Sequence, residues 1–213
     1  TFNASGQLVQ ADAPLPRLSD NGRHAIINPV TGATDFGTDG ILTWGRWVGQ
    51  VTAGALVTTY TENQGLHYVV GLPTAVLPTT GTATYTLAPT DATRPTYLNG
   101  MTAPGTFTGS IDATFGASPT VKTVGWQVAM PANGVTGVPA ATFGIADTTI
   151  PVTGSKFATT AGAITSGCVS ACTTDIAGFF AGPNAERIGA GYSINNNGAG
   201  GSAVIGVAAF KKQ

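Results

Sequence analysis

Alternation between apolar and polar positions marks this chain as a β protein. The clearest case is residues 106–115, where Phe107, Ile111 and Phe115 share one face and threonines dominate the other. A period of two is typical of a strand with one buried face. No segment shows the 3.6-residue period of a long helix. Similar runs occur at residues 41–48, 66–72, 82–88, 120–130, 141–147, 176–182, 189–194 and 202–210.

Short links between these runs favour consecutive antiparallel strands. Glycines lie inside several of them, at Gly45, Gly109, Gly125 and Gly206, and suit the bends of a small closed barrel. Closure also removes exposed strand edges. The sequence therefore predicts an all-β fold, an antiparallel up-and-down eight-stranded β-barrel, with a β-sandwich as the alternative.

The first part of the chain lacks this regularity. Residues 1–38 hold PLPR, DNGR, NPVTG and DFGTDG, which are turn sequences. We expect residues 1–38 to form an extended arm or linker, and residues 39–213 to form the barrel domain.

Charge is scarce in this protein. Charged residues make up 9% of the chain, against about 25% in an average globular domain, and the net charge is -1. Nucleic acids and acidic membrane surfaces need clustered Lys and Arg, so neither is an expected partner. No run of about 20 apolar residues exists, and we expect no transmembrane segment in this chain.

Two cysteines, Cys168 and Cys172, lie four positions apart in SGCVSACTTD. We predict a disulfide between them, with a pair of free thiols as the alternative. A disulfide indicates an oxidising compartment, so the expected location is extracytoplasmic: the periplasm, the bacterial cell surface or the medium outside.

The sequence offers little catalytic chemistry. It has no G-x-S-x-G element, and its histidines are His24 and His67 alone. The prediction is that the protein is not an enzyme and needs no cofactor. The alternative is heme or metal ligation, for which His67 beside Tyr68 is the better candidate; a histidine at a strand end or on the surface is the favoured interpretation.

The run DFGTDG, residues 35–40, has some features of a calcium loop. Counted from Asp35, the twelfth position is Arg46, where such a loop needs an acidic ligand. A turn with Gly40 in the left-handed conformation is therefore preferred.

A binding site should lie where loops bring polar and aromatic groups together. Three segments qualify: residues 60–67, 89–102 and 168–175. Trp44 and Trp47 are three apart, so they lie on opposite strand faces, and one of them is expected in the core. The possible contact residues for a ligand or partner are Trp44, Tyr60, His67, Tyr68, Arg94 and Tyr97.

The end of the chain carries a family resemblance. GFFAGPNAERIG, residues 178–189, followed by the final strand GSAVIGVAAFKK, resembles the closing segment of transferrin-binding protein B-like β-barrel domains. The upstream runs ILTWGRWVG and HYVVGLPT also resemble the barrel of some bacterial proteins with a FecR-type domain. The pattern departs at Ala181, an extra residue, and at Ala190, where a second glycine is expected. The matching residues are Gly178, Phe179, Phe180, Gly182, Pro183, Asn184, Ala185, Glu186, Gly189, Val207, Phe210 and Lys211.

The resemblance implies a surface or periplasmic barrel of a Gram-negative bacterium, from a group of iron-acquisition proteins that bind host proteins or heme through loops. Transferrin binding is not carried over, because the lobe that grips transferrin has no counterpart here. We expect the turn at Glu186 and Arg187 to hold the fold together, with a ligand role as the alternative. The predicted function is a non-catalytic binding module for a protein partner. The alternative is a structural subunit that self-associates through its N-terminal arm.

Overall fold

The computed structural model describes residues 2, 4, 10–11, 25–27, 33–53, 56–88, 90–168, 172–195 and 202–213, and within them every regular element is a strand. Seven strands precede residue 80: β1 (Gln10–Ala11), β2 (Ala25–Ile27), β3 (Ala33–Thr38), β4 (Leu42–Trp47), β5 (Gly49–Ala53), β6 (Leu56–Tyr60) and β7 (Leu66–Gly71). Ten follow: β8 (Gly81–Thr86), β9 (Thr96–Tyr97), β10 (Thr106–Phe115), β11 (Thr120–Met130), β12 (Ala141–Ile145), β13 (Thr149–Thr153), β14 (Lys156–Ser166), β15 (Thr173–Ala181), β16 (Arg187–Asn195) and β17 (Val204–Lys212).

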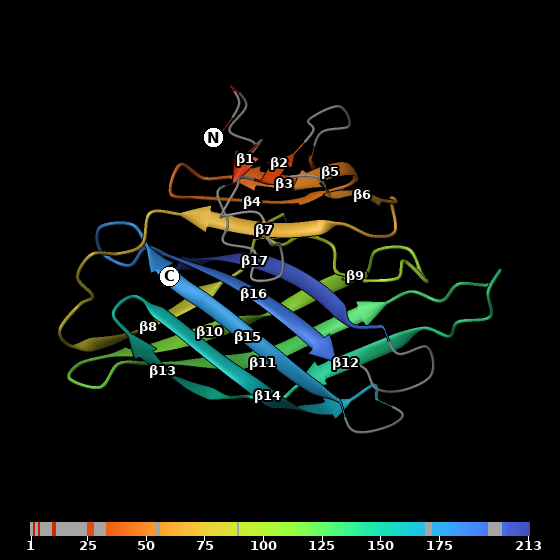
Figure 1. Ribbon diagram of the computed structural model, residues 1–213. Helices are drawn as coiled ribbons and strands as arrows, with labels where there is room; N and C mark the ends of the chain where they lie inside the picture. Colours follow the sequence, from red (N-terminus) through yellow and green to blue (C-terminus); the bar gives the residue numbers. More distant parts are fainter. Residues whose placement is uncertain are drawn as a thin grey trace.

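Strands β8 to β17 close into an antiparallel barrel (Figure 1). The order around it is β8, β10, β11, β12 with β13, β14, β15, β16 and β17, and β17 pairs back with β8. β12 and β13 share one position, because β12 pairs with residues 127–130 of β11 and β13 pairs with residues 120–122. The predicted eight-stranded up-and-down barrel is confirmed.

The alternation predicted for residues 106–115 is present in β10, which buries one face and exposes the other. Phe107, Ile111 and Phe115 point into the core, while the threonines between them are exposed. The ladder with β11 shifts register between Thr108 and Ser110, because Gly109 alone lies opposite two residues of β11, Gly125 and Trp126. Gly125, in the left-handed conformation at φ 61°, therefore makes a bulge in β11, and the ring of Trp126 lies where a Gly109 side chain would be.

The barrel interior is filled by side chains. Phe107 packs edge-to-face on Trp126 at a centroid distance of 5.1 Å and stacks on Tyr192 at 4.7 Å. Trp126 also stacks on Phe210 at 5.7 Å. These rings belong to one buried cluster, to which each of the strands β8 to β17 contributes inward-facing side chains. The barrel is a packed core rather than a container.

One seam of the barrel is paired only in part. β17 meets β8 at Thr86 and Tyr85, and it meets β9 at Thr96 and Tyr97. Between these two contacts, Ala92 bridges Ala208, and backbone hydrogen bonds join Thr93 N to the Val207 oxygen and Ala209 N to the Asp91 oxygen. We call residues 87–88 and 90–95 the seam connection, and its residues 91–93 lie beside β17 without forming a named strand.

A three-stranded sheet, ordered β3-β4-β7, lies on the outer side of the barrel at β16 and β17 (Figure 1). Leu42 and Trp44 of β4 pack against Val207 and Ala209 of β17, together with Ala181. The opposite face carries Trp47 and Tyr68, whose rings lie 4.3 Å apart. The prediction that Trp44 and Trp47 occupy opposite faces is confirmed, and both are buried.

The barrel begins later in the chain than the expected residue 39. Residues 42–47 and 66–71 are strands, as predicted, but they pair with each other and with β3, and the first barrel strand starts at Gly81. The barrel instead contains β14, which the sequence pattern did not predict because most of its side chains are small and exposed. Most of the expected arm, residues 1–38, lies outside the described residues, although its last six residues form β3.

Candidate functional site

The six possible contact residues divide by burial. Trp44, Tyr68 and Tyr97 are buried, at 3%, 8% and 3% exposure, so their rings contribute to packing. The indole Nε1 of Trp44 donates to the carbonyl oxygen of Thr90 at 3.0 Å, which attaches β4 to the seam connection. Tyr60 is half-buried against the Trp47–Tyr68 pair. His67 and Arg94 belong to a polar cluster at the same seam.

His67 of β7 contacts both Thr93 of the seam connection and Thr96 of β9 through its two ring nitrogens. Its Nδ1 lies 2.7 Å from the hydroxyl of Thr93, and its Nε2 lies 2.9 Å from the hydroxyl of Thr96. Burial lowers the pKa of His67 to about 3, and the nearby charge of Arg46 adds to this, against an opposing effect of Asp35. A neutral ring, which donates from one nitrogen and accepts at the other, matches the two hydroxyls.

Arg46, Asp35 and Arg94 extend this cluster. The buried Arg46 donates from Nε to Asp35 Oδ2 at 2.8 Å, and the exposed Arg94 donates from Nε to Asp35 Oδ1 at 2.7 Å. Arg46 also donates from Nη1 to the carbonyl oxygens of Glu62 and Gln64. Burial by itself raises the pKa of Asp35, but the hydrogen bonds and charges of the two guanidiniums outweigh it and hold that pKa below its usual value.

Asp35 is presented to both arginines by an unusual backbone. Its φ is 55°, a left-handed conformation rare outside glycine, and it lies in the register shift of β3 against β4. Both carboxylate oxygens are occupied by guanidinium groups, which is not the arrangement of a calcium ligand. The turn at residues 39–41 has Gly40 at φ 83°, so the left-handed turn is confirmed.

The family-like motif lies at one barrel end, between β15 and β16. The carboxylate of Glu186 accepts hydrogen bonds from the backbone N and the Nδ2 of Asn184, and the first of these chiefly lowers the pKa of Glu186. Tyr85 donates its hydroxyl to the carbonyl oxygen of Ala185. Arg187 donates to the carboxylate of Asp39, which links this turn to the one before β4. The contacts of Glu186 and Arg187 are thus within the fold.

Loops gather at the other barrel end. We call this surface the loop end: residues 61–65, 98–105 and 131–140. Gln64 Nε2 donates to the carbonyl oxygen of Leu98 at 2.8 Å, and Asn133 Nδ2 donates to that of Met101 at 2.7 Å. Leu98 stays 52% exposed and Val135 stays 96% exposed. Two of the three predicted loop segments therefore lie against each other.

The third predicted segment carries the cysteines, between β14 and β15. Cys168 and Cys172 form a disulfide, with their Cα atoms 6.1 Å apart, and both lie against the barrel core. Asp175 accepts hydrogen bonds from the backbone N of Ala161 at 3.0 Å and from Asn195 Nδ2 at 3.2 Å.

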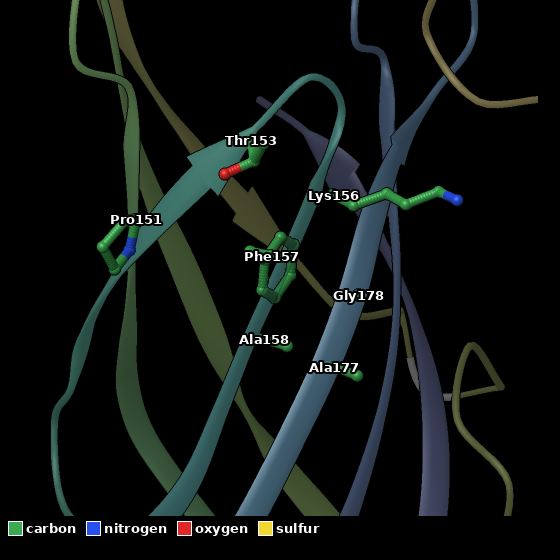
Figure 2. Close-up of a pocket in the computed structure, with 7 residues that line it drawn as sticks. All are labelled: Pro151, Thr153, Lys156, Phe157, Ala158, Ala177 and Gly178. Carbon is green, nitrogen blue, oxygen red and sulfur yellow. The ribbon is translucent and has the colours of Figure 1, made fainter.

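Two hollows lie on the surface. One, of about 520 Å³, crosses the outer wall at β13, β14 and β15 (Figure 2). The other, of about 410 Å³, lies beside the motif turn. The first is lined by Pro151, Thr153, Lys156, Phe157, Ala158, Ala177 and Gly178, and the second by Gly40, Ile41, Leu72, Pro73, Ala75, Gly182 and Pro183.

Within the described ranges, no three His, Cys, Asp or Glu side chains gather closely enough to hold a metal ion. No helix of suitable length and hydropathy for a membrane crossing is found among the residues that the structure covers.

Sequence reasoning missed Arg46 and Asp35 as a pair. The sequence did indicate such a pair, because Arg46 lies inside the apolar run ILTWGRWV and a buried arginine needs an acidic partner. It missed Thr93 and Thr96 because nothing local to them predicts a partner 26 or 29 positions away.

No protein-family model matches the chain, and no curated protein matches it. The solved structures that resemble it include two of transferrin binding protein B, a vaccine antigen from Haemophilus parasuis Hp5. A double mutant gives a TM-score of 0.43 at 17% identity, over 92% of this chain and 36% of that one. A single mutant gives 0.39 at 14% identity, over 99% of this chain and 42% of that one. The chain spans less than half the length of either, and membership of that family stays a prediction.

Proposed function

We propose that this protein is a non-catalytic β-barrel binding module that acts outside the cytoplasm and binds a protein partner through its loop end. The observation that carries the proposal is the convergence of three separate chain segments there, fixed to one another by the Gln64–Leu98 and Asn133–Met101 hydrogen bonds. Loops held in place by a rigid scaffold bind at a low entropic cost.

The packed interior directs binding to the outside. Phe107, Trp126 and Tyr192 fill the middle of the barrel, so its walls enclose side chains rather than a ligand. Leu98 and Val135, in contrast, present apolar surface to solvent at the loop end. Exposed apolar groups near polar neighbours such as Glu62 and Asn99 are typical of a protein interface.

The extracytoplasmic location is supported by the disulfide. Cys168–Cys172 bonds persist in oxidising compartments and are rare in the cytosol. The Gram-negative cell surface and a role in iron acquisition come from the family resemblance at residues 178–189, and we propose them on that basis alone. Both nitrogens of His67 are engaged by threonine hydroxyls, so we propose no heme or metal ligation at this residue.

A binding panel with paired variants tests this function. The intact chain is measured by biolayer interferometry against iron-loaded transferrin, hemin and a set of abundant serum proteins. For any protein that binds, L98D/V135D should weaken affinity at least about tenfold, since a charge in an apolar interface core is costly. L72D/V76D is the matched control, because Leu72 and Val76 are also exposed, at 84% and 75%, but lie at the barrel end of the family-like motif.

Two results would count against the proposal. One is that no protein in the panel binds; the other is that the two double variants weaken binding equally. The alternative function, a structural subunit joined by the N-terminal arm, concerns residues that lie largely outside the described ones and stays a prediction.

A further inference from the structure

Strand β6 (Leu56–Tyr60) is the last strand of the four-stranded sheet ordered β1-β2-β5-β6 (Figure 1). In the part of the chain that the structure describes, β5 is the strand that pairs with it, through five consecutive residue pairs. Val57, Thr58 and Thr59 are all exposed, Val57 at 55%. In an antiparallel ladder, alternate residues turn their backbone N–H and C=O groups to the outer edge.

This edge carries none of the usual devices that block pairing. Natural edge strands are protected by lysines, prolines, inward charges or bulges. The sequence of β6 is LVTTY, with no charge and no proline, and its ladder with β5 runs without a register shift. Val, Thr and Tyr are among the residues that strands favour most. The edge is a template for one more strand.

We propose that β6 pairs with β6 of a second copy of this chain, antiparallel and centred on Thr58. This register lets the whole strand pair: Thr58 faces Thr58, Val57 faces Thr59 of the second copy, and Leu56 faces its Tyr60. An antiparallel pair of identical strands is related by a two-fold axis, so each strand satisfies the edge groups of the other.

The charge of the chain favours a second copy as the occupant. The nearest charged residue after β6 is Glu62, and the five residues that pair are uncharged. The net charge of -1 gives little repulsion between copies. A β-branched pair such as Val57 with threonine also packs well across strands.

Charge variants at the centre of the pairing test it. Sedimentation velocity of the intact chain over a wide concentration range should show a monomer–dimer equilibrium. Thr58→Lys and Thr58→Glu should each raise the dimer dissociation constant about tenfold or more, because like charges face each other across the axis. An equimolar mixture of the two variants should associate again. Thr160→Lys is the control, since Thr160 is also exposed but lies in β14, which has strand neighbours on both sides.

A cysteine variant checks the register itself. Directly opposed Cα atoms in an antiparallel pair lie about 4.5–5.5 Å apart, within disulfide range. Thr58→Cys should therefore give a covalent dimer on mild oxidation, while Thr160→Cys should not. A wild-type chain that stays monomeric at every concentration overturns the proposal, as does a dimer that neither charge variant weakens and Thr58→Cys does not trap. The readout is the mass of the chain alone, so it is independent of the partner bound at the loop end.

Discussion

The hydroxyl of Tyr85 donates a hydrogen bond to the carbonyl oxygen of Ala185 at 2.6 Å, across 100 positions of the sequence. Both residues are fully buried, and Ala185 has a left-handed φ of 56°. Tyr85 stands on β8, at the barrel seam, whereas Ala185 lies in the turn between β15 and β16. This contact therefore holds the family-like turn against the inside of the barrel end.

Replacing Tyr85 with Phe should lower the free energy of unfolding by about 1–3 kcal/mol, because the Ala185 carbonyl would lose its partner while still buried. Urea denaturation at neutral pH measures this. Tyr192→Phe is the matched control: the Tyr192 hydroxyl is buried and has no hydrogen-bond partner among the described residues. Its removal should be neutral or stabilising, and equal losses in the two variants would contradict this account.

A second prediction concerns two glycines on the outer face of β16. A Cβ on Gly189 would lie 2.8 Å from Val69 of β7 and 3.0 Å from the ring of Phe179, whereas a Cβ on Gly191 would have its nearest neighbour at 3.6 Å. Gly189→Ala should destabilise the protein by about 1–3 kcal/mol, and Gly191→Ala should be tolerated. Thermal unfolding of both variants compares them directly. Similar midpoints would mean that β7 does not pack on β16 as described.

The strands could be predicted from the sequence, whereas the layers that they form could not. Clean alternation in residues 106–115 and 120–130 predicted strands that the structure has at the same places. Apolar side chains on both faces of residues 41–48 predicted a strand buried on both sides, which β4 is. The pattern could not say which layers bury it, because period-two alternation identifies faces and not the sheet opposite them.

The polar cluster shows the other limit. His67 meets Thr93 and Thr96 because the seam connection runs beside β17 without forming a regular strand, and such a path has no sequence period. The structure nevertheless brings two of the predicted loop segments, 60–67 and 89–102, together through the hydrogen bond from Gln64 to Leu98. Their turn and polar residues marked them as connections, but no sequence pattern showed that they would meet, because the first joins β6 to β7 outside the barrel.

The Asp35–Arg46 pair gives a third prediction. Arg46 is fully buried, so loss of its carboxylate partner leaves a buried charge that is poorly compensated. Asp35→Asn, which tolerates the left-handed backbone, should cost about 3 kcal/mol of unfolding free energy. Lys122→Gln removes the exposed Lys122–Asp147 pair and should change stability by less than about 0.5 kcal/mol. Urea titrations of the two variants provide the measurement, and an Asp35→Asn loss as small as that of the control would refute the buried-pair argument.

The last prediction is the pH dependence that His67 gives to folding. Burial lowers its pKa from 6.5 to about 3, so the unfolded chain takes up a proton at pH values where the folded chain does not. For a group whose pKa is depressed on folding, stability is present above the unfolded pKa and is lost as the pH falls toward the folded pKa. The window is therefore set between about pH 6.5 and pH 3.

His67→Gln keeps a donor and an acceptor near Thr93 and Thr96 but cannot titrate. Between about pH 6.5 and pH 4.5, the unfolding free energy of the wild type should fall by about 2 kcal/mol more than that of the variant. Urea titrations at matched ionic strength measure both slopes, and the subtraction removes carboxylates such as Asp35, whose pKa is lowered from 3.8 and whose titration is common to the two proteins. Parallel slopes would mean that His67 is protonated inside the fold, and that the neutral ring described between the two threonines is wrong.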